Sequence, residues 1–270
     1  MKYLNHYYSI YRNQVDEFSI FFQYYKNLFN NSNHKNKYKH EDGCSVHDKI
    51  YPGTTNSFKS DCITCMKYLE YLDDDISNEK EQKQGIIYLY FWLRYYELQN
   101  NINNVKTLDS INTLMDSYEK ISSNYSNIQN VYNNHIKSIL NDELNVELNN
   151  ELSDLFYIYE KFDNFQKNKV CTDTKCTCAK ECVQKYMSSI KKCSTYRYFC
   201  NELEKFRKKY NDYKISETDC PEVDSYLPSY RNFSTSVIIL ISFITISVLS
   251  SLLFILYKVI AIFIYLFIVQ

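Results

Sequence analysis

An uncharged apolar stretch near the carboxyl end constrains this chain more than any other feature. Residues 237–257 read VIILISFITISVLSSLLFILY, 21 residues without a charged side chain. A helix of that length is about 30 Å long, which matches the hydrocarbon core of a bilayer. A buried core helix is the alternative, but such helices rarely lack charges over so many positions. We therefore expect a transmembrane helix over 237–257, with its ends marked by Val237, Tyr257 and Lys258.

The segments around this span leave its orientation open. Arg231 precedes it and Lys258 follows it, so basic residues are balanced across the membrane. The opening sequence MKYLNHYYSIYRNQ contains no continuous apolar region, so we do not expect a signal peptide. Residues 259–270 read VIAIFIYLFIVQ, which is too short for a second crossing. We expect 258–270 to be a short atypical tail, and we hypothesise that 259–270 translates an unspliced AT-rich intron.

The scarcity of turn residues predicts a mainly α fold. Only 3 Gly and 3 Pro occur in 270 residues, where average usage would give roughly 30 together. Most β architectures need such residues every few positions, and Gly-rich phosphate loops need them in clusters. A net charge of −1 gives no global field that would attract nucleic acid. We expect a helical, cysteine-containing ectodomain followed by a single transmembrane helix.

Apolar residues at helical spacing outline the expected domain over residues 1–210. One stripe starts near Val15, a second over 58–72 carries two cysteines, and residues 86–98 are apolar nearly all round. Residues 31–57 are polar and predict a loop. Residues 122–150 are Asn-rich and weakly periodic, which is typical of a polar helix or a flexible connector. Residues 211–236 contain two prolines and are expected to form a stalk that reaches the membrane.

The cysteines predict a disulfide-stabilised domain. All ten precede the apolar span, and seven fall between residues 171 and 220. An even, dense set is typical of ectodomains exposed to an oxidising environment. The probable disulfide cysteines are Cys44, Cys62, Cys65, Cys171, Cys176, Cys178, Cys182, Cys193, Cys200 and Cys220. Zinc binding and reduced buried thiols are the alternatives; zinc is disfavoured because only Cys62 and Cys65 form a clean C-x2-C pair.

No catalytic apparatus can be assembled from the residue spacing. The chain lacks a recognisable nucleophile–base set and a regular metal-ligand pattern. We therefore expect no enzyme activity, no cofactor and no metal site. Among partners we expect the lipid bilayer. We expect neither nucleic acid nor a small-molecule substrate.

Several segments, in order, resemble the Plasmodium interspersed repeat (PIR) superfamily, in particular its Vir-type variant surface proteins. The matching segments are DCITCMKYLEYL (61–72), IIYLYFWLRYYEL (86–98), the cysteine-rich block 171–200, YLPSYRNFSTS (226–236) and the span closed by Leu-Tyr-Lys at 256–258. The resemblance covers the chain up to Lys258. It implies a helical variable ectodomain, one transmembrane helix, a short tail and no enzymatic activity.

The resemblance also implies a role in immune evasion and adhesion at the infected red-cell surface or at parasite-derived membranes, with a host receptor or antibodies as unidentified partners. The sequence departs from the family pattern at Gln84 and Gly85, where members often carry a cysteine, and it lacks an R-x-L-x-E/Q/D export pattern. A different class fits the same features: a tail-anchored scaffold or trafficking protein with a cytosolic helical domain. Cysteine oxidation distinguishes the two, because disulfides do not persist in a reducing cytosol.

Overall fold

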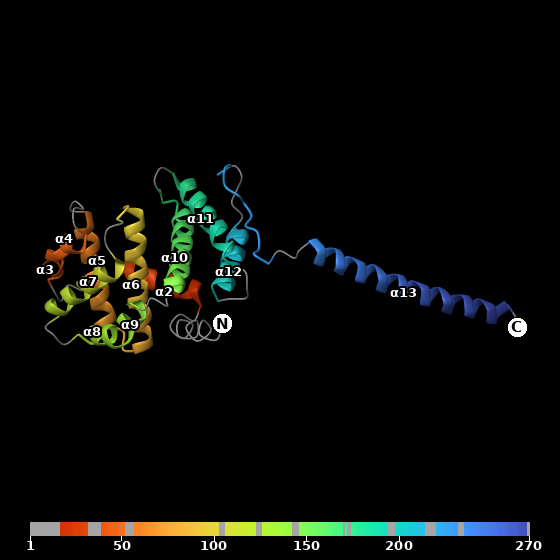
Figure 1. Ribbon diagram of the computed structural model, residues 1–270, viewed down its shortest axis with the longest axis horizontal. Helices are drawn as coiled ribbons and strands as arrows, with labels where there is room; N and C mark the ends of the chain where they lie inside the picture. The colour runs from red at the N-terminus through yellow and green to blue at the C-terminus, as the bar shows by residue number, and fades with distance from the viewer. Residues whose placement is uncertain are drawn as a thin grey trace. The chain divides into compact units, whose positions relative to one another are not determined.

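The chain forms two units, Met1–Pro228 and Ser229–Gln270. The computed structural model describes residues 17–31, 39–51, 57–102, 106–122, 126–141, 146–169, 171, 174–193, 198–213, 220–231 and 235–268. Within these ranges the regular structure is helical and contains no strand (Figure 1). The predicted mainly α fold, with one apolar helix after the helical domain, is therefore confirmed.

The helices follow one another with short connections in the first unit (Figure 1). They are α2 (Phe18–Asn31), α3 (His40–Gly43), a 3-10 turn η2 (Cys44–Val46), α4 (His47–Ile50), α5 (Ser57–Asp74), α6 (Glu79–Gln99), α7 (Thr107–Ile121), α8 (Asn127–Val131), a π-helical turn η3 (Tyr132–Ile136), α9 (Lys137–Asn141), α10 (Val146–Gln166), α11 (Lys175–Ile190) and α12 (Tyr198–Tyr213). The second unit contains α13 (Thr235–Ile268).

An aromatic core joins helices α2, α6, α10 and α12. The rings of Phe22 and Phe156 meet edge to face with centroids 5.3 Å apart, and Tyr88 lies 5.4 Å from Phe156. Tyr159 extends the cluster to Phe206, with centroids 5.1 Å apart. Tilted and edge-on pairs of this kind stabilise a core beyond the area they bury. The predicted helical stripes of α2 and α5 lie in this interior, apart from Val15, which lies outside the described residues.

Two segments are helical where the structure describes them: one was predicted as a loop, and for the other a polar helix and a flexible connector were both left open. Residues 40–50 of the expected loop form α3, η2 and α4, and residues 127–141 of the Asn-rich segment form α8, η3 and α9. Of the two alternatives for 122–150, the structure has the helix over 127–141, and again from residue 146, where α10 begins. The reason is that apolar residues spaced among the asparagines are buried. They are Ile128, Val131, Tyr132, Ile136 and Leu140.

Asparagine replaces glycine at the ends of two long helices. Asn101 follows α6 and Asn168 follows α10, and both have positive φ, 54° and 52°. In each case the next amide donates to a carbonyl of the last turn: Ile102 N lies 2.9 Å from Glu97 O, and Lys169 N lies 2.9 Å from the carbonyl oxygen of residue 164. This is the Schellman pattern, in which Asn is the usual substitute for Gly. The chain can thus terminate long helices although it contains only three glycines.

The sequence predicted a helical domain that ends at residue 210 and a stalk over 211–236. The observed helical unit extends further along the chain. Helix α12 continues to Tyr213, and the first unit extends to Pro228. Cys220 and Leu227 are buried, and Cys220 is bonded to Cys176. Residues 220–228 therefore belong to the helical domain; residues 214–219 and 232–234 lie outside the described part.

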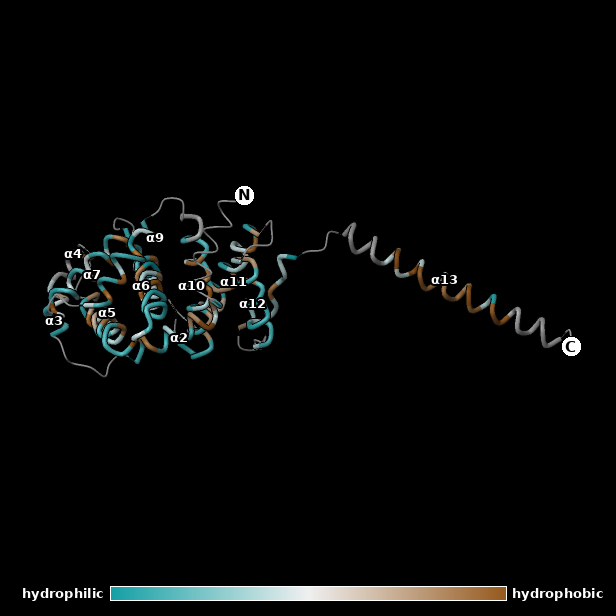
Figure 2. The backbone as a smooth tube through the Cα atoms, turned by 90° about the horizontal axis from the view of Figure 1, so that it is seen from below, coloured by the Kyte–Doolittle hydropathy of each residue, from teal (hydrophilic) through white to brown (hydrophobic). Residues whose placement is uncertain are grey.

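The second unit is a long apolar helix. Helix α13 spans Thr235–Ile268, 34 residues, and the coloured part of this helix in Figure 2 is mostly hydrophobic, with short paler and hydrophilic interruptions. Residues Ser242–Ile260 form a stretch long and apolar enough to cross a membrane. The helix does not end at Tyr257, where the sequence placed the boundary, because the residues after Lys258 are also apolar and contain no helix breaker.

Candidate functional site

The cysteine pairing is the most distinctive chemistry of the helical domain. The structure contains four disulfides, Cys44–Cys62, Cys171–Cys178, Cys176–Cys220 and Cys193–Cys200. Three of them lie around α11 and α12. Each closes a loop of the unfolded chain, and a native bridge of this kind typically contributes about 2–4 kcal/mol to stability.

Cys65 and Cys182 are free buried thiols, which corrects the expectation that all ten cysteines form bridges. Each lies one helical turn after a cysteine that is already paired: Cys62 precedes Cys65, and Cys178 precedes Cys182. Burial raises the pKa of both thiols above the usual value of 9.0. Because the thiolate is the reactive form, these two side chains behave as small apolar core residues rather than as nucleophiles.

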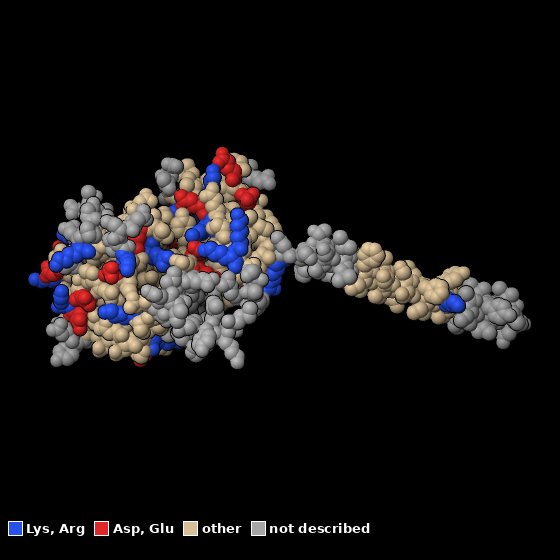
Figure 3. Space-filling model, in the orientation of Figure 1, with Lys and Arg blue, Asp and Glu red and all other residues tan. Residues whose placement is uncertain are grey.

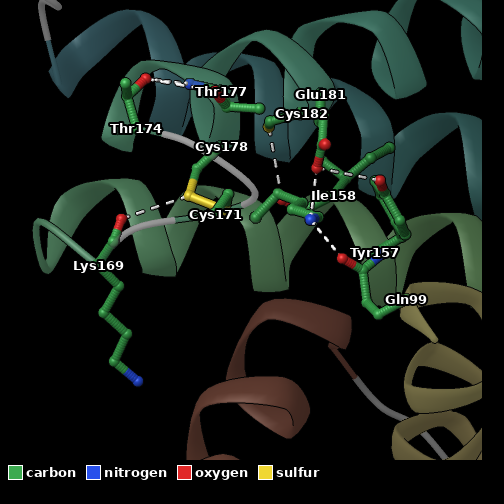
Figure 4. Close-up of polar contacts among 11 residues, drawn as sticks. Gln99, Tyr157, Ile158, Lys169, Cys171, Thr174, Thr177, Cys178, Glu181 and Cys182 are labelled. Carbon is green, nitrogen blue, oxygen red and sulfur yellow. Dashed lines mark hydrogen bonds and ion pairs between the residues drawn. A yellow bond between two sulfur atoms is a disulfide. The ribbon is translucent and has the colours of Figure 1, made fainter.

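The start of α11 is built around the bridge between Cys171 and Cys178 (Figure 4). Thr174 caps the helix, since its side-chain oxygen accepts a hydrogen bond from Thr177 N at 3.3 Å. On the core side, the Cys182 thiol donates to the carbonyl of Ile158 at 3.5 Å. Helix α11 is thus held to α10 by this contact, while the disulfide joins its first turn to the segment that follows α10.

A buried lysine connects three helices beside this bridge. Lys161 of α10 is paired with Glu181 of α11, and its Nζ donates to Gln99 Oε1 at 2.7 Å at the end of α6. The ammonium also lies 5.3 Å from the Tyr157 ring centroid and 5.8 Å from that of Tyr95. Figure 4 shows Gln99, Tyr157 and Glu181 converging from their separate helices. The Lys161 side chain is only 2 % exposed, so these partners replace the water that its ammonium loses on burial.

A second buried lysine couples α2 to α10. Lys26 Nζ lies 2.6 Å from Glu160 Oε2 and 2.7 Å from Asp163 Oδ2. The Lys26 side chain is 4 % exposed, and the paired carboxylates are also largely buried. Sequence reasoning missed Lys26 and Lys161, because the partners lie on other helices and no local pattern marks a lysine as buried.

No metal centre is formed by the residues that the structure describes. Within them, no group of three His, Cys, Asp or Glu side chains is arranged to hold a metal ion. Asp73 of the acidic run 73–75 instead binds the start of α8: its Oδ1 accepts from Ile128 N at 3.0 Å, and its Oδ2 accepts from the Tyr118 hydroxyl at 3.2 Å. Asp73 therefore acts as a structural acceptor between α5, α7 and α8.

The predicted membrane segment has internally satisfied hydroxyls. Ser247 donates to Phe243 O at 2.8 Å and Ser251 donates to Ser247 O at 2.9 Å, so both hydroxyls bond a carbonyl of the preceding turn. Lys258 is the one charged residue of α13, with its ammonium 5.9 Å from the Phe254 ring centroid. By contrast, basic and acidic side chains are interspersed on the visible face of the helical domain (Figure 3).

Comparison of the chain with protein-family models, with curated proteins and with solved structures gave no match.

Proposed function

We propose that this chain is a membrane-anchored surface protein whose disulfide-bonded helical domain is displayed outside the cytosol. The observation that carries the proposal is the set of four disulfides, all placed before one apolar helix. Structural disulfides persist in oxidising compartments and are rare in a reducing cytosol. They therefore favour display over the tail-anchored, cytosolic alternative.

The resemblance to the PIR superfamily supports a more specific role. We propose that the domain is a variant surface antigen of a malaria parasite, which functions in immune evasion and in adhesion. The cysteine-rich block over 171–200, which carries part of the resemblance, contributes to three of the four bridges. Adhesion would use exposed aromatic side chains, because tyrosine supplies contact area at low entropic cost; those of Tyr24, Tyr213 and Tyr226 are 43 %, 43 % and 64 % exposed.

A thiol-labelling experiment on cells that express the full chain tests the display proposal. Intact cells are treated with a membrane-impermeant maleimide, with or without prior reduction by an impermeant phosphine. The masses of the cysteine-containing peptides are then measured by mass spectrometry. We expect the peptides carrying Cys171, Cys176 and Cys178 to be labelled on intact cells only after reduction. Labelling that requires permeabilisation, without any need for reduction, would show a cytosolic reduced domain and refute display.

The two free thiols provide an internal control for the same measurement. When the purified oxidised protein is denatured without reduction, only Cys65 and Cys182 should react, and reduction should add the other eight cysteines. A variant with both Cys65→Ser and Cys182→Ser should take up no label before reduction. More than two labels on the unreduced wild-type chain would show that the proposed bridges are incomplete.

A further inference from the structure

Residues 220–228, which we name the strap, are held against α11 at both of their ends. At the first end, Cys220 is bonded to Cys176 in the first turn of α11. At the other end, the hydroxyl of Tyr186, also on α11, donates to Pro228 O at 2.7 Å. Cys220 and the Tyr186 side chain are buried, so neither contact is a loose surface association.

Helix α12 holds the middle of the strap. The Tyr210 hydroxyl donates to Asp224 O at 2.7 Å. The Asn211 side chain makes a pair of bonds to Leu227, whose amide donates to Asn211 Oδ1 at 2.8 Å and whose carbonyl accepts from Asn211 Nδ2 at 3.2 Å. Leu227 is fully buried. Arg207 of α12 also donates from Nη1 to the Tyr226 hydroxyl at 3.2 Å, so side chains of α11 and α12 make five hydrogen bonds to the strap in addition to its disulfide.

The position of the strap in the chain gives these contacts a mechanical consequence. Pro228 is the last residue of the helical unit, and the next residues lead to α13. If α13 is the membrane anchor, as proposed above, a force on the displayed domain enters it at Pro228. That force loads the bonds at Pro228, Leu227 and Asp224 before it reaches the covalent bond at Cys220.

We propose that the strap is a load-bearing clasp: once its hydrogen bonds to α11 and α12 have released, the Cys176–Cys220 bridge keeps the residues that it encloses out of the path of tension. The Cys176–Cys220 bridge spans a sequence separation of 44 and encloses α12 and nearly all of α11. Tension that passes along the strap crosses directly from Cys220 to Cys176 and bypasses the enclosed residues. The hydrogen bonds from Tyr186, Tyr210 and Asn211 keep the strap in place until the load exceeds their strength.

Single-molecule pulling on the full oxidised chain in a bicelle, with handles at both ends, tests the hydrogen-bonded part of the clasp. We expect a small early extension as residues 221–228 detach, about 28 Å at roughly 3.5 Å per residue. Tyr186→Phe combined with Asn211→Ala should lower the force of this step. Tyr132→Phe is the matched control, since its hydroxyl donates to Asn112 at 2.8 Å away from the strap. An unchanged force in the Tyr186→Phe, Asn211→Ala variant would overturn the proposal.

Removal of the bridge tests the covalent part. In Cys176→Ser, Cys220→Ser the enclosed helices enter the load path. The Cys171–Cys178 and Cys193–Cys200 bridges still hold, so the added path runs over residues 178–193 and 200–220, and we expect roughly 120 Å more extension at about 3.5 Å per residue. An extension equal to that of the wild type would overturn the clasp. If circular dichroism shows this variant to be unfolded before pulling, the hydrogen-bond variant decides the question alone. The force curve of the purified oxidised chain does not depend on membrane orientation, so its outcome is separate from that of the labelling experiment.

Discussion

Gly85 is the point of closest approach between α5 and α6 at the scale of single residues. A Cβ atom at this position would lie 2.6 Å and 2.7 Å from the two Cδ atoms of Leu72, and the Gly85 carbonyl accepts from the Tyr68 hydroxyl at 3.2 Å. Any larger residue must displace a fully buried leucine. The close packing of α5 against α6 therefore favours a residue without a side chain at position 85.

We predict that Gly85→Ala lowers the free energy of unfolding by about 1–2 kcal/mol, because overpacking outweighs the gain in helix propensity. Leu72→Ala alone should cost about 2–5 kcal/mol through the cavity it leaves. In the double variant the alanine occupies part of that cavity, so the two costs should not add. Denaturant unfolding of the four proteins measures the coupling; strictly additive costs would show that Gly85 and Leu72 do not constrain each other.

Glu97 gives a pH prediction at the same scale. Its carboxylate is buried and accepts hydroxyl bonds from Tyr51 at 2.9 Å, Ser110 at 3.1 Å and Thr107 at 2.5 Å. Burial raises the pKa of Glu97 above its usual value of 4.5, and the hydroxyl donors oppose this shift. As the pH rises above 4.5, the unfolded chain ionises first and binds fewer protons than the folded chain. The contribution of Glu97 to stability is therefore fully present below pH 4.5 and declines as the pH rises.

Glu97→Gln should remove this pH-dependent contribution while keeping an acceptor for the hydroxyls. We expect the stability of Glu97→Gln, relative to the wild type, to increase as the pH rises above 4.5 through the folded-state pKa. Urea unfolding at a series of pH values measures it. Asp212→Asn changes the net charge equally at an exposed site and serves as the control. A pH-independent difference between Glu97→Gln and the wild type would contradict the assignment.

At the scale of elements, Lys161 of α10 connects this helix to α6 and α11. We predict that Lys161→Met lowers the free energy of unfolding by about 2–3 kcal/mol, less than a fully buried pair would lose, because Glu181 is 26 % exposed. Adding Glu181→Gln should recover part of the loss, since no unpaired carboxylate remains. Lys185→Met is the matched control: that lysine is one-third exposed in its pair with Asp154 and should cost less than about 1 kcal/mol. If Lys161→Met and Lys185→Met lowered the free energy of unfolding equally, burial would not make the Lys161 contacts more important than those of Lys185.

The same elements show which parts of the fold can be predicted from sequence. The helical stripes of α2 and α5 were predictable because burial there repeats every three or four residues. The partners of Lys161 were not, because Gln99 lies 62 positions earlier on another helix. The burial of the apolar residues within 127–141 was harder to predict, because asparagines are interspersed among them. The candidate disulfide cysteines could be named, but their pairing depends on which helices lie side by side.

At the scale of the whole molecule, Lys258 determines where α13 sits in a bilayer if α13 is the membrane anchor proposed above. The helix has 34 residues and is therefore about 51 Å long, whereas the hydrocarbon core is about 30 Å thick. A tilt large enough to bury all of it would exceed about 50°, beyond the usual range of 0–40°. Only one part can be in the core, either the residues before Lys258 or a stretch centred near it. Because a lysine at the bilayer centre costs roughly 2.5–3.5 kcal/mol, the first position is favoured.

We predict that Lys258→Leu abolishes this preference and draws the residues after position 258 into the bilayer. A cysteine introduced at Ile264 reports the change, because the native cysteines are bridged or buried and do not compete for a water-soluble maleimide. In open membrane fragments, Ile264→Cys should react readily when Lys258 is present and several-fold more slowly with Lys258→Leu. Lys258→Arg keeps the charge and should preserve the faster reaction. Equal labelling of the Lys258→Leu and Lys258→Arg proteins would mean that hydrophobic length, rather than this single charge, positions the helix.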